Sequence, residues 1–247
     1  MAELGPEEGR ALCEALEGPA PTSVRLHPQR PCRWSGAEAV PWSPAGRYLT
    51  ERPSFTLDPA FHAGAYYVQE ASSQFVGHLL AAVRTEGARI LDLCAAPGGK
   101  AVYIAQLRKA SVTACDIYPH RVELIRSYAR RMGVNLTAVE NDATVYRPEF
   151  SEKFDCVICD VPCSGLGVMF SKPDVTFNRS EKDIPALNAI QSAVLEQAAK
   201  YVKKGGFVNY STCTVLREEN EDIVRRFLSV HPDFSLVRAS AEGVEAD

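Results

Sequence analysis

Two cysteines stand out in this sequence because each follows an apolar run and lies in a short polar motif. Cys163 lies within Asp160-Val161-Pro162-Cys163-Ser164-Gly165, and Cys213 closes Tyr210-Ser211-Thr212-Cys213. A structural cysteine usually packs as a small buried hydrophobic residue, whereas a thiol just past a strand end is a candidate nucleophile. Two such cysteines indicate covalent chemistry.

The sequence also contains a Gly-Gly turn that follows an apolar strand and opens a helix, in Leu91-Asp92-Leu93-Cys94-Ala95-Ala96-Pro97-Gly98-Gly99-Lys100. It is not a P-loop, because Cys94 stands where glycine is needed and Ala101 where serine or threonine is needed. It also lacks the G-x-G-x-x-G of dinucleotide-binding proteins. What remains is a tight turn whose backbone N–H groups can hold a carboxylate at a helix N-terminus.

Two further acids lie at the ends of predicted strands, where they could bind other parts of the same ligand. Asp116 ends the second strand, where its carboxylate can accept hydrogen bonds from two ribose hydroxyls. Asp142 follows the third strand and can accept a hydrogen bond from an adenine amino group. An amino-acid carboxylate, a ribose and an adenine together predict S-adenosylmethionine as the cofactor.

The two thiols indicate which methyl acceptor such a cofactor would serve. Most acceptors, such as amines and hydroxyls, need only a base and correct orientation. Carbon 5 of a pyrimidine is a poor nucleophile until a thiolate adds to carbon 6 and creates an enamine. After methyl transfer a base must remove the carbon-5 proton before the sulfur can leave. The paired cysteines therefore favour a pyrimidine carbon-5 methyltransferase.

The motifs around Lys100, Cys163 and Cys213, in this order, resemble those of the RsmB/RsmF (NOP2/Sun) family of RNA cytosine-5 methyltransferases, over roughly residues 22–235. The resemblance implies an RNA substrate, most simply ribosomal RNA. It also implies that Cys213 is the nucleophile, that Cys163 assists product release and that Asp160 hydrogen-bonds the cytosine ring. The cofactor site that it implies is lined by Cys94, Ala95, Ala96, Pro97, Gly98, Gly99, Lys100, Asp116, Arg121, Asp142 and Asp160.

Two alternatives stay open. In DNA cytosine methyltransferases the thiol of the Pro-Cys motif attacks, so Cys163 would be the nucleophile and Cys213 incidental. The chain could also be an RNA-binding scaffold that keeps the fold with little or no turnover. The paired cysteines and the arginine-rich N-terminal region favour the RNA methyltransferase.

The chemistry requires the motifs to meet at one edge of a sheet, and from about residue 71 the chain alternates helices and strands. The expected helices are 71–83, 99–108, 119–132, an amphipathic helix that includes Ile184 and Ala198, and 218–229. The expected strands are 89–93, 112–115, 136–139, 154–159 and 206–210. This alternation predicts an α/β protein with a parallel, doubly wound sheet, which binds ligands at the carboxyl ends of its strands. The fold class is a Rossmann-like S-adenosylmethionine-dependent methyltransferase.

Two regions are predicted along the chain. Residues 1–62 form an N-terminal accessory or RNA-contact region, with a short helix over 6–17 and then a segment rich in Pro, Gly, Ser and Arg. Residues 63–247 form the catalytic domain. The chain ends before the last strand pair of this fold, so we expect the final strands to be missing.

The charge distribution bears on nucleic-acid binding. The net charge is −4, yet residues 1–17 and 217–247 each carry −4, so residues 18–216 carry +4. Arg25 belongs to a cluster before the Gly-Gly turn, and Lys172 follows the Cys163 motif; we expect both to contact RNA. Four more arginines recur at near-helical spacing and fit phosphate contacts or a solvated face: Arg121, Arg126, Arg130 and Arg131.

Several functions are disfavoured by the composition. The chain has no apolar run near the roughly 18 residues that span a membrane, and its acidic start is unlike a signal peptide. We therefore expect a cytoplasmic monomer whose eight cysteines are reduced. Cys156 and Cys159 lie three apart in a strand and so point to opposite faces, which argues against a shared metal ion.

Overall fold

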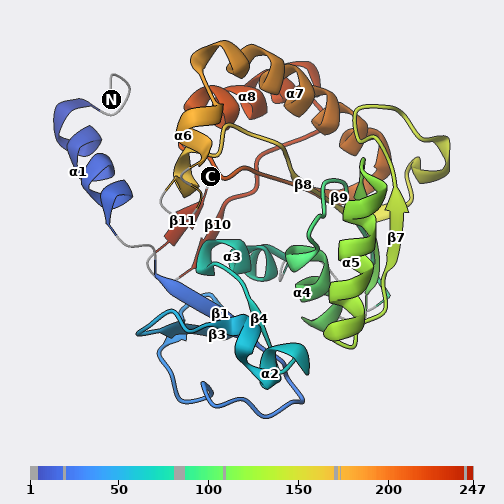
Figure 1. Cartoon of the computed structure of the whole chain (residues 1–247). Helices are drawn as coiled ribbons and strands as arrows, with labels where there is room; N and C mark the ends of the chain where they lie inside the picture. The colour runs from blue at the N-terminus through green and yellow to red at the C-terminus, as the bar shows by residue number, and fades with distance from the viewer. Residues whose placement is uncertain are drawn as a thin grey trace.

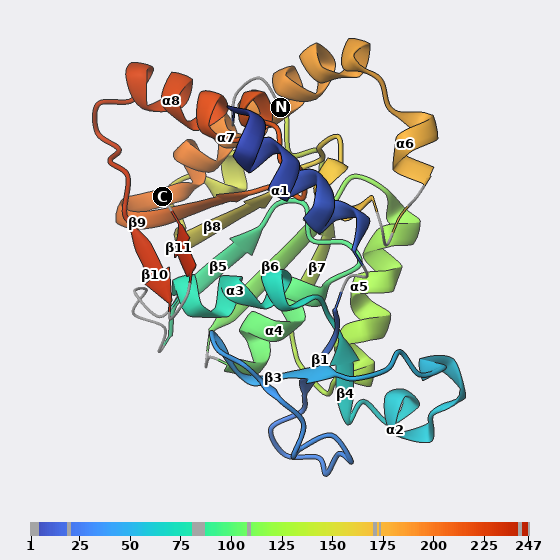
Figure 2. The ribbon, with the colours of Figure 1, turned by 90° about the vertical axis from the view of Figure 1, so that its left-hand side faces the viewer.

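The computed structural model of the protein describes residues 5–18, 21–80, 87–107, 110–169, 172, 174–241 and 244–246. Its larger part is a parallel five-stranded sheet in the order β7-β6-β5-β8-β9 (Figures 1 and 2). The strands are β5 (Arg89–Asp92), β6 (Ser111–Asp116), β7 (Thr137–Glu140), β8 (Phe154–Asp160) and β9 (Val202–Ser211). The predicted α/β class with a parallel sheet is thus confirmed.

Helices cover both faces of this sheet. One layer consists of α3 (Ala71–Leu79), α4 (Gly99–Leu107) and α5 (Pro119–Arg131), and the other of α7 (Ile184–Tyr201) with α8 (Glu221–Val230) packed against it. Along β8, Cys156 and Ile158 belong to the first core cluster, and Val157 and Cys159 to the second. The two cysteines therefore face opposite layers, as their spacing predicted. None of the described helices is both long and apolar enough to cross a membrane.

The N-terminal region is more regular than its composition suggested. After α1 (Gly5–Glu17), four strands form an antiparallel sheet in the order β2-β3-β1-β4. They are β1 (Thr22–Leu26), β2 (Ala39–Val40), β3 (Ser43–Leu49) and β4 (Tyr66–Val68), with α2 (Pro59–His62) before the last. Val24, Phe55 and Tyr66 form a small core of their own. Because β4 pairs with β1, this sheet continues past residue 62.

Short helical turns and a terminal hairpin complete the described chain. The turns are η1 (Phe55–Leu57), η3 (Pro148–Phe150), η4 (Leu166–Val168), α6 (Asp174–Asn178), η5 (Glu181–Asp183) and η6 (Arg217–Glu219). The hairpin pairs β10 (Ala239–Ala241) with β11 (Val244–Ala246). Within the described ranges no strand joins the main sheet beyond β9. The predicted end of the helix over 71–83 lies partly outside the described residues.

Arg25 anchors the N-terminal sheet to the main domain. Its side chain is 1% exposed, Nε donates to Gln69 Oε1 at 2.8 Å, and Nη1 donates to Gln106 Oε1 on α4. The guanidinium also lies over the ring of Tyr103, 4.4 Å from its centroid. Such a buried side chain cannot reach a phosphate. The predicted RNA contact at Arg25 is therefore wrong, because the arginine stabilises the junction between the two sheets instead.

Replacing Arg25 with alanine should destabilise the fold strongly. The change leaves the buried Gln69 oxygen and the half-buried Gln106 oxygen without this donor and opens a void beside Tyr103, so we expect the free energy of unfolding to fall by about 2–4 kcal/mol. Urea unfolding measures this loss. The exposed Arg52 gives a matched control, since Arg52→Ala should change stability by no more than about 0.5 kcal/mol. Equal effects of the two substitutions would contradict the anchoring role.

Candidate active site

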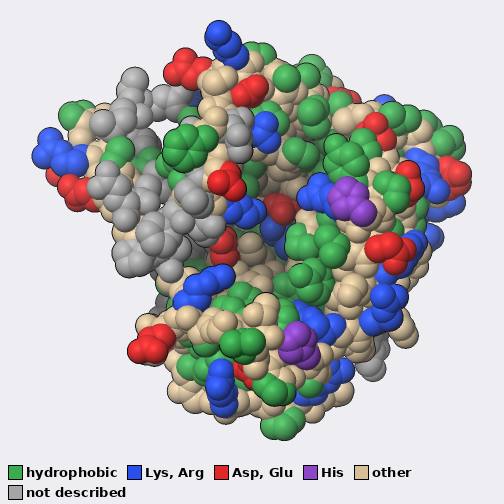
Figure 3. Space-filling model, in the orientation of Figure 1, with side chains coloured by type: hydrophobic (Ala, Val, Ile, Leu, Met, Phe, Trp, Pro, Cys, Tyr) green, Lys and Arg blue, Asp and Glu red, His purple; other side chains and the backbone are tan. Residues whose placement is uncertain are grey.

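The polar motifs gather where the five parallel strands end. In the orientation of Figure 1, Figure 3 shows a face hollowed near its centre, with basic, acidic and apolar side chains around the hollow. The loop after β5 opens α4, and its geometry depends on Gly98, whose φ of +109° favours glycine. Ala95 N–H donates to Cys115 O at 2.8 Å and Gly98 N–H to Ala95 O at 2.7 Å. The loop is therefore held in one shape against β6.

A charged network joins this loop to the first cysteine motif. Lys100 Nζ lies 2.6 Å from Asp160 Oδ2 at the end of β8. Ser211 Oγ, at the end of β9, donates to Asp160 Oδ1 at 2.9 Å. The Asp160 carboxylate is thus fixed from two sides, by residues of two other strand-end motifs. The structure brings together three motifs that lie 60 and 51 residues apart along the chain.

The two acids predicted to bind the nucleoside lie at neighbouring strand ends. Asp116 is 5% exposed; it accepts a hydrogen bond from Tyr118 N–H at 3.1 Å and lies 3.5 Å from Arg121 Nη1. Asp142 Oδ1 accepts hydrogen bonds from the backbone N–H and the hydroxyl of Thr144, at 2.9 and 2.7 Å. Local bonds therefore orient both carboxylates, and each keeps further acceptor capacity for a ligand.

Two buried polar groups at the same edge fit an additional ligand. Neither carboxylate oxygen of Asp92 makes a hydrogen bond of normal geometry within the described part of the chain, although the residue is 1% exposed at the end of β5; a weak contact with the N–H of Cys94 is all that approaches it there. The Nδ2 of Asn141, just past β7, likewise has no partner there. Buried polar groups normally have partners, so an acceptor and a donor left over at the same edge of the sheet, on either side of the end of β6, suit a polar, nucleotide-like cofactor. Asp92 and Asn141 were not among the predicted site residues, although Asp92 is a polar residue at the end of one strand and Asn141 follows another.

The environment of Asp92 makes the stability of the fold depend on pH. Burial, with a smaller contribution from Asp160, raises the pKa of Asp92 from 3.8 to about 7. An unfolded chain therefore releases this proton near pH 4 and the folded chain only near pH 7. The free energy of unfolding therefore decreases between about pH 4 and pH 7, by about 1.4 kcal/mol per pH unit. This loss of stability is fully present above pH 7.

Asp92→Asn should remove this loss of stability, because an amide does not ionise. We expect the substitution to raise the unfolding midpoint more at pH 8 than at pH 4, because only the wild-type protein must bury a carboxylate at high pH. Thermal unfolding across this range is the measurement. A stability difference that does not change with pH would show that Asp92 titrates normally in the folded protein.

The two cysteines lie together beside Asp160. Their sulfur atoms are 3.3 Å apart, and the N–H of Cys213 also donates to Cys163 Sγ at 3.3 Å. Cys213 is exposed and Cys163 is half-buried. Either thiol could donate the hydrogen bond that joins the two sulfur atoms; with Cys163 as the donor, this bond lowers the pKa of Cys213 to about 7, and the charges of Lys172 and Lys100 act in the same direction. The same hydrogen bond raises the pKa of Cys163 well above its usual range. Cys213 is therefore the more exposed and the more acidic thiol.

The basic residues predicted to contact RNA divide into two groups. Lys172 is exposed and close enough for its charge to act on Cys213. Arg130 is also exposed. By contrast, Arg131 donates to the carbonyls of Phe61 and Tyr66, and Arg126 donates to the carbonyl of Ala138. Arg126 and Arg131 thus have structural roles that their near-helical spacing did not indicate.

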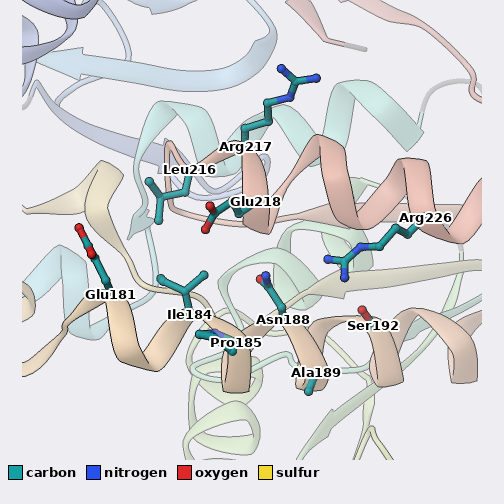
Figure 4. Close-up of a pocket in the computed structure, with 10 residues that line it drawn as sticks. All are labelled: Glu181, Ile184, Pro185, Asn188, Ala189, Ser192, Leu216, Arg217, Glu218 and Arg226. Atoms are coloured by element: carbon teal, nitrogen blue, oxygen red, sulfur yellow. The ribbon is translucent and has the colours of Figure 1, made fainter. Parts of the chain in front are cut away.

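A separate hollow in the described surface lies between α7 and η6. Its volume is about 850 Å³, and Figure 4 shows it between α7 and the turn that precedes α8. It is lined by Glu181, Ile184, Pro185, Asn188, Ala189, Ser192, Leu216, Arg217, Glu218 and Arg226. None of the predicted site residues lines it. Among the described residues, no group of three or more His, Cys, Asp and Glu side chains could hold a metal ion.

A parallel α/β sheet with a Gly-Gly loop after its first strand and acids at the next strand ends defines a Rossmann-like, S-adenosylmethionine-dependent methyltransferase. The sequence model of 16S rRNA methyltransferase RsmB/F matches residues 79–246, and the chain belongs to this family. Residues 1–71 match the N-terminal domain of 16S rRNA methyltransferase RsmF. The predicted family and its cofactor, S-adenosylmethionine, are thereby confirmed.

Curated relatives agree with this assignment. The "Probable ribosomal RNA small subunit methyltransferase B" of Bacillus subtilis (strain 168) is 41% identical over 178 residues, which are 70% of this chain and 39% of the relative. The ribosomal RNA small subunit methyltransferase B of Escherichia fergusonii is 33% identical over 245 residues, covering 94% of this chain and 56% of the relative. The chain thus spans about half the length of the curated relatives it matches.

Solved structures show the same fold. The crystal structure of PH0851 has a TM-score of 0.86 at 29% identity and covers 95% of this chain and 56% of its own. The structure of NSun6 from Pyrococcus horikoshii with SFG has a TM-score of 0.63 at 31% identity, covering 75% of this chain and 47% of its own.

Proposed function

We propose that this chain methylates carbon 5 of a cytosine in RNA, most simply ribosomal RNA, through a covalent adduct between Cys213 and the base. The observation that supports this best is the pair of thiols 3.3 Å apart at the sheet edge, beside a carboxylate held by Lys100. A methyltransferase acting on an amine or a hydroxyl would have no use for this pair. Family membership supports the RNA substrate.

The proposed reaction begins at Cys213. Its thiolate adds to carbon 6 of the cytosine, and the electron pair of the 5,6 double bond makes carbon 5 nucleophilic. S-adenosylmethionine, when bound, supplies the electrophilic methyl group that carbon 5 takes. A base then removes the carbon-5 proton, the double bond re-forms, and the sulfur of Cys213 leaves as a thiolate.

Cys163 is suited to act as the base that removes the carbon-5 proton. While Cys213 is a free thiolate, Cys163 keeps its proton and donates it in a hydrogen bond. Once Cys213 is bonded to carbon, its sulfur is neutral and no longer raises the pKa of Cys163. Cys163 can then ionise and accept the carbon-5 proton. In the proposed reaction Asp160 hydrogen-bonds the cytosine ring; its contacts with Lys100 and Ser211, which hold the carboxylate in one orientation, support this role.

A direct assay tests the proposal against its alternative. The protein is incubated with labelled S-adenosylmethionine and bulk unmodified RNA, and the digested RNA is analysed for nucleosides. We expect labelled 5-methylcytidine. Absence of label with intact cofactor binding would contradict the proposal and favour an RNA-binding scaffold that keeps the fold without turnover.

RNA contacts should be visible in the salt dependence of binding. Lys172 and Arg130 are exposed, so replacing both with alanine should reduce the slope of log affinity against log salt by about 0.7 per lost phosphate contact. The matched control is Arg126→Ala, because Arg126 already donates to a backbone carbonyl. Fluorescence titrations with a single-stranded RNA at several salt concentrations give the slopes. An unchanged slope would assign Lys172 and Arg130 to a solvated face.

A further inference from the structure

Glu219 is a buried carboxylate that the reaction outlined above does not use. It ends η6, one residue, Asn220, separates it from α8, and its side chain is 0% exposed. Its oxygens accept hydrogen bonds from the N–H of Ser164 at 2.9 Å, from Ser164 Oγ at 2.5 Å and from Gln191 Nε2 at 2.9 Å. Because every one of these donors is buried or half-buried, losing the acceptor would leave polar groups unsatisfied. Glu219 therefore restrains the chain around Ser164.

This restraint acts on Cys163. Ser164 follows Cys163 directly, so Glu219 holds the peptide group on one side of the thiol. Gln191, which donates to Glu219, also donates from Nε2 to the carbonyl of Pro162 at 3.0 Å and so holds the peptide group on the other side. The backbone on both sides of Cys163 is thus fixed by one buried network.

The neighbouring residue, Asn220, does the same for the second cysteine. Its Oδ1 accepts a hydrogen bond from Thr212 Oγ1 at 2.6 Å, and its Nδ2 donates to the carbonyl of Leu216 at 2.8 Å. Thr214 Oγ1 lies 2.7 Å from Ser164 Oγ, which links the two loops directly. Two adjacent residues at the start of one helix therefore hold both cysteine loops.

We propose that Glu219 is a positioning residue which, with Asn220, sets the distance between the two thiols so that Cys163 donates its hydrogen bond to Cys213. Glu219 reaches neither sulfur itself and acts through the Cys163 loop. The inference deepens the proposed function, because the reaction needs Cys213 as a thiolate near neutral pH. It can nevertheless be tested without RNA or cofactor.

The test is the pH dependence of Cys213 alkylation by iodoacetamide, followed by mass spectrometry of the Cys213 peptide. In the wild-type protein the hydrogen bond from Cys163 lowers the pKa of Cys213 to about 7. Loss of that bond should return the pKa toward the ordinary value of about 8.5, so the alkylation rate at pH 7 should fall roughly tenfold.

Two variants and one control are compared, and the direction in which the pKa of Cys213 shifts distinguishes loss of position from loss of charge. Glu219→Gln keeps the size of the side chain but loses an acceptor, and Ser164→Ala removes the hydroxyl that joins Glu219 to Thr214. Removing a negative charge near a thiol would by itself lower its pKa, so a rise in Glu219→Gln reports loss of position and not of charge. The control is Glu218→Gln, since Glu218 is exposed and lines the outer hollow of Figure 4.

We expect both variants to raise the pKa of Cys213 and the control to leave it near 7. If Glu219→Gln does not fold, Ser164→Ala decides alone. A wild-type alkylation profile in the folded variants would overturn the positioning role, even in a protein that methylates RNA. If the variants show a shifted alkylation profile but the wild-type protein forms no 5-methylcytidine, the proposed function is rejected and the positioning role of Glu219 is retained.

Discussion

Replacing Cys163 with alanine is expected to leave the protein covalently attached to its RNA after denaturation. The thiol of Cys213 remains, so attack on carbon 6 and methyl transfer can still occur. The step that frees Cys213 lacks the group that accepts the carbon-5 proton, and the adduct accumulates. Denaturing gel electrophoresis with labelled RNA should show a shifted band that ribonuclease removes.

Cys213→Ala should give the opposite result. Without the sulfur that activates carbon 5, no adduct forms, and we expect methylation to fall by about 10⁴-fold or more, the scale seen when a nucleophile is removed from an enzyme. Cys32→Ala is a suitable control, because Cys32 lies in the N-terminal core cluster and should leave both readouts unchanged. An adduct that forms in Cys213→Ala and requires Cys163 would reverse the roles and support the DNA-type assignment.

The strands of the main sheet could be predicted because their sequences are short apolar runs that end in polar residues. Four of the five lie within one residue of the expected range at each end. The fifth, β9, begins at Val202, earlier than expected, because Val202 pairs with Phe154 across an irregularity in the ladder that no local pattern shows. The position of the motifs followed from topology, since parallel strands bring their carboxyl ends to one edge.

What the sequence could not show is which side chains become buried by contacts between distant segments. Arg25 was expected on the surface from its charge, yet its partners Gln69 and Gln106 come from other elements. Glu219 stands in a run of acids that is typical of a solvated helix start. Only the packing of its turn against Ser164 and Gln191 identifies it as the buried one.

Asp116 should account for a large part of cofactor affinity. Its carboxylate is 5% exposed and already oriented by Tyr118 and Arg121, so it can accept hydrogen bonds from ribose hydroxyls with little reorganisation. Hydrogen bonds to a charged acceptor contribute about 1.5–3 kcal/mol each, and 1.4 kcal/mol corresponds to a tenfold change. Asp116→Ala is therefore expected to weaken cofactor binding by more than tenfold.

RNA binding should be nearly unaffected by the same substitution, because Lys172 and Arg130 lie outside the Asp116 network. Calorimetric titration with S-adenosylhomocysteine gives the cofactor affinity, and a fluorescence titration gives the RNA affinity. Glu123→Ala is the matched control, since Glu123 is an exposed acid on α5 that pairs with Arg126. Unchanged cofactor affinity in a folded Asp116→Ala protein would show that Asp116 is not part of the cofactor site. A parallel loss of RNA binding would instead show that the substitution had disturbed the whole edge of the sheet.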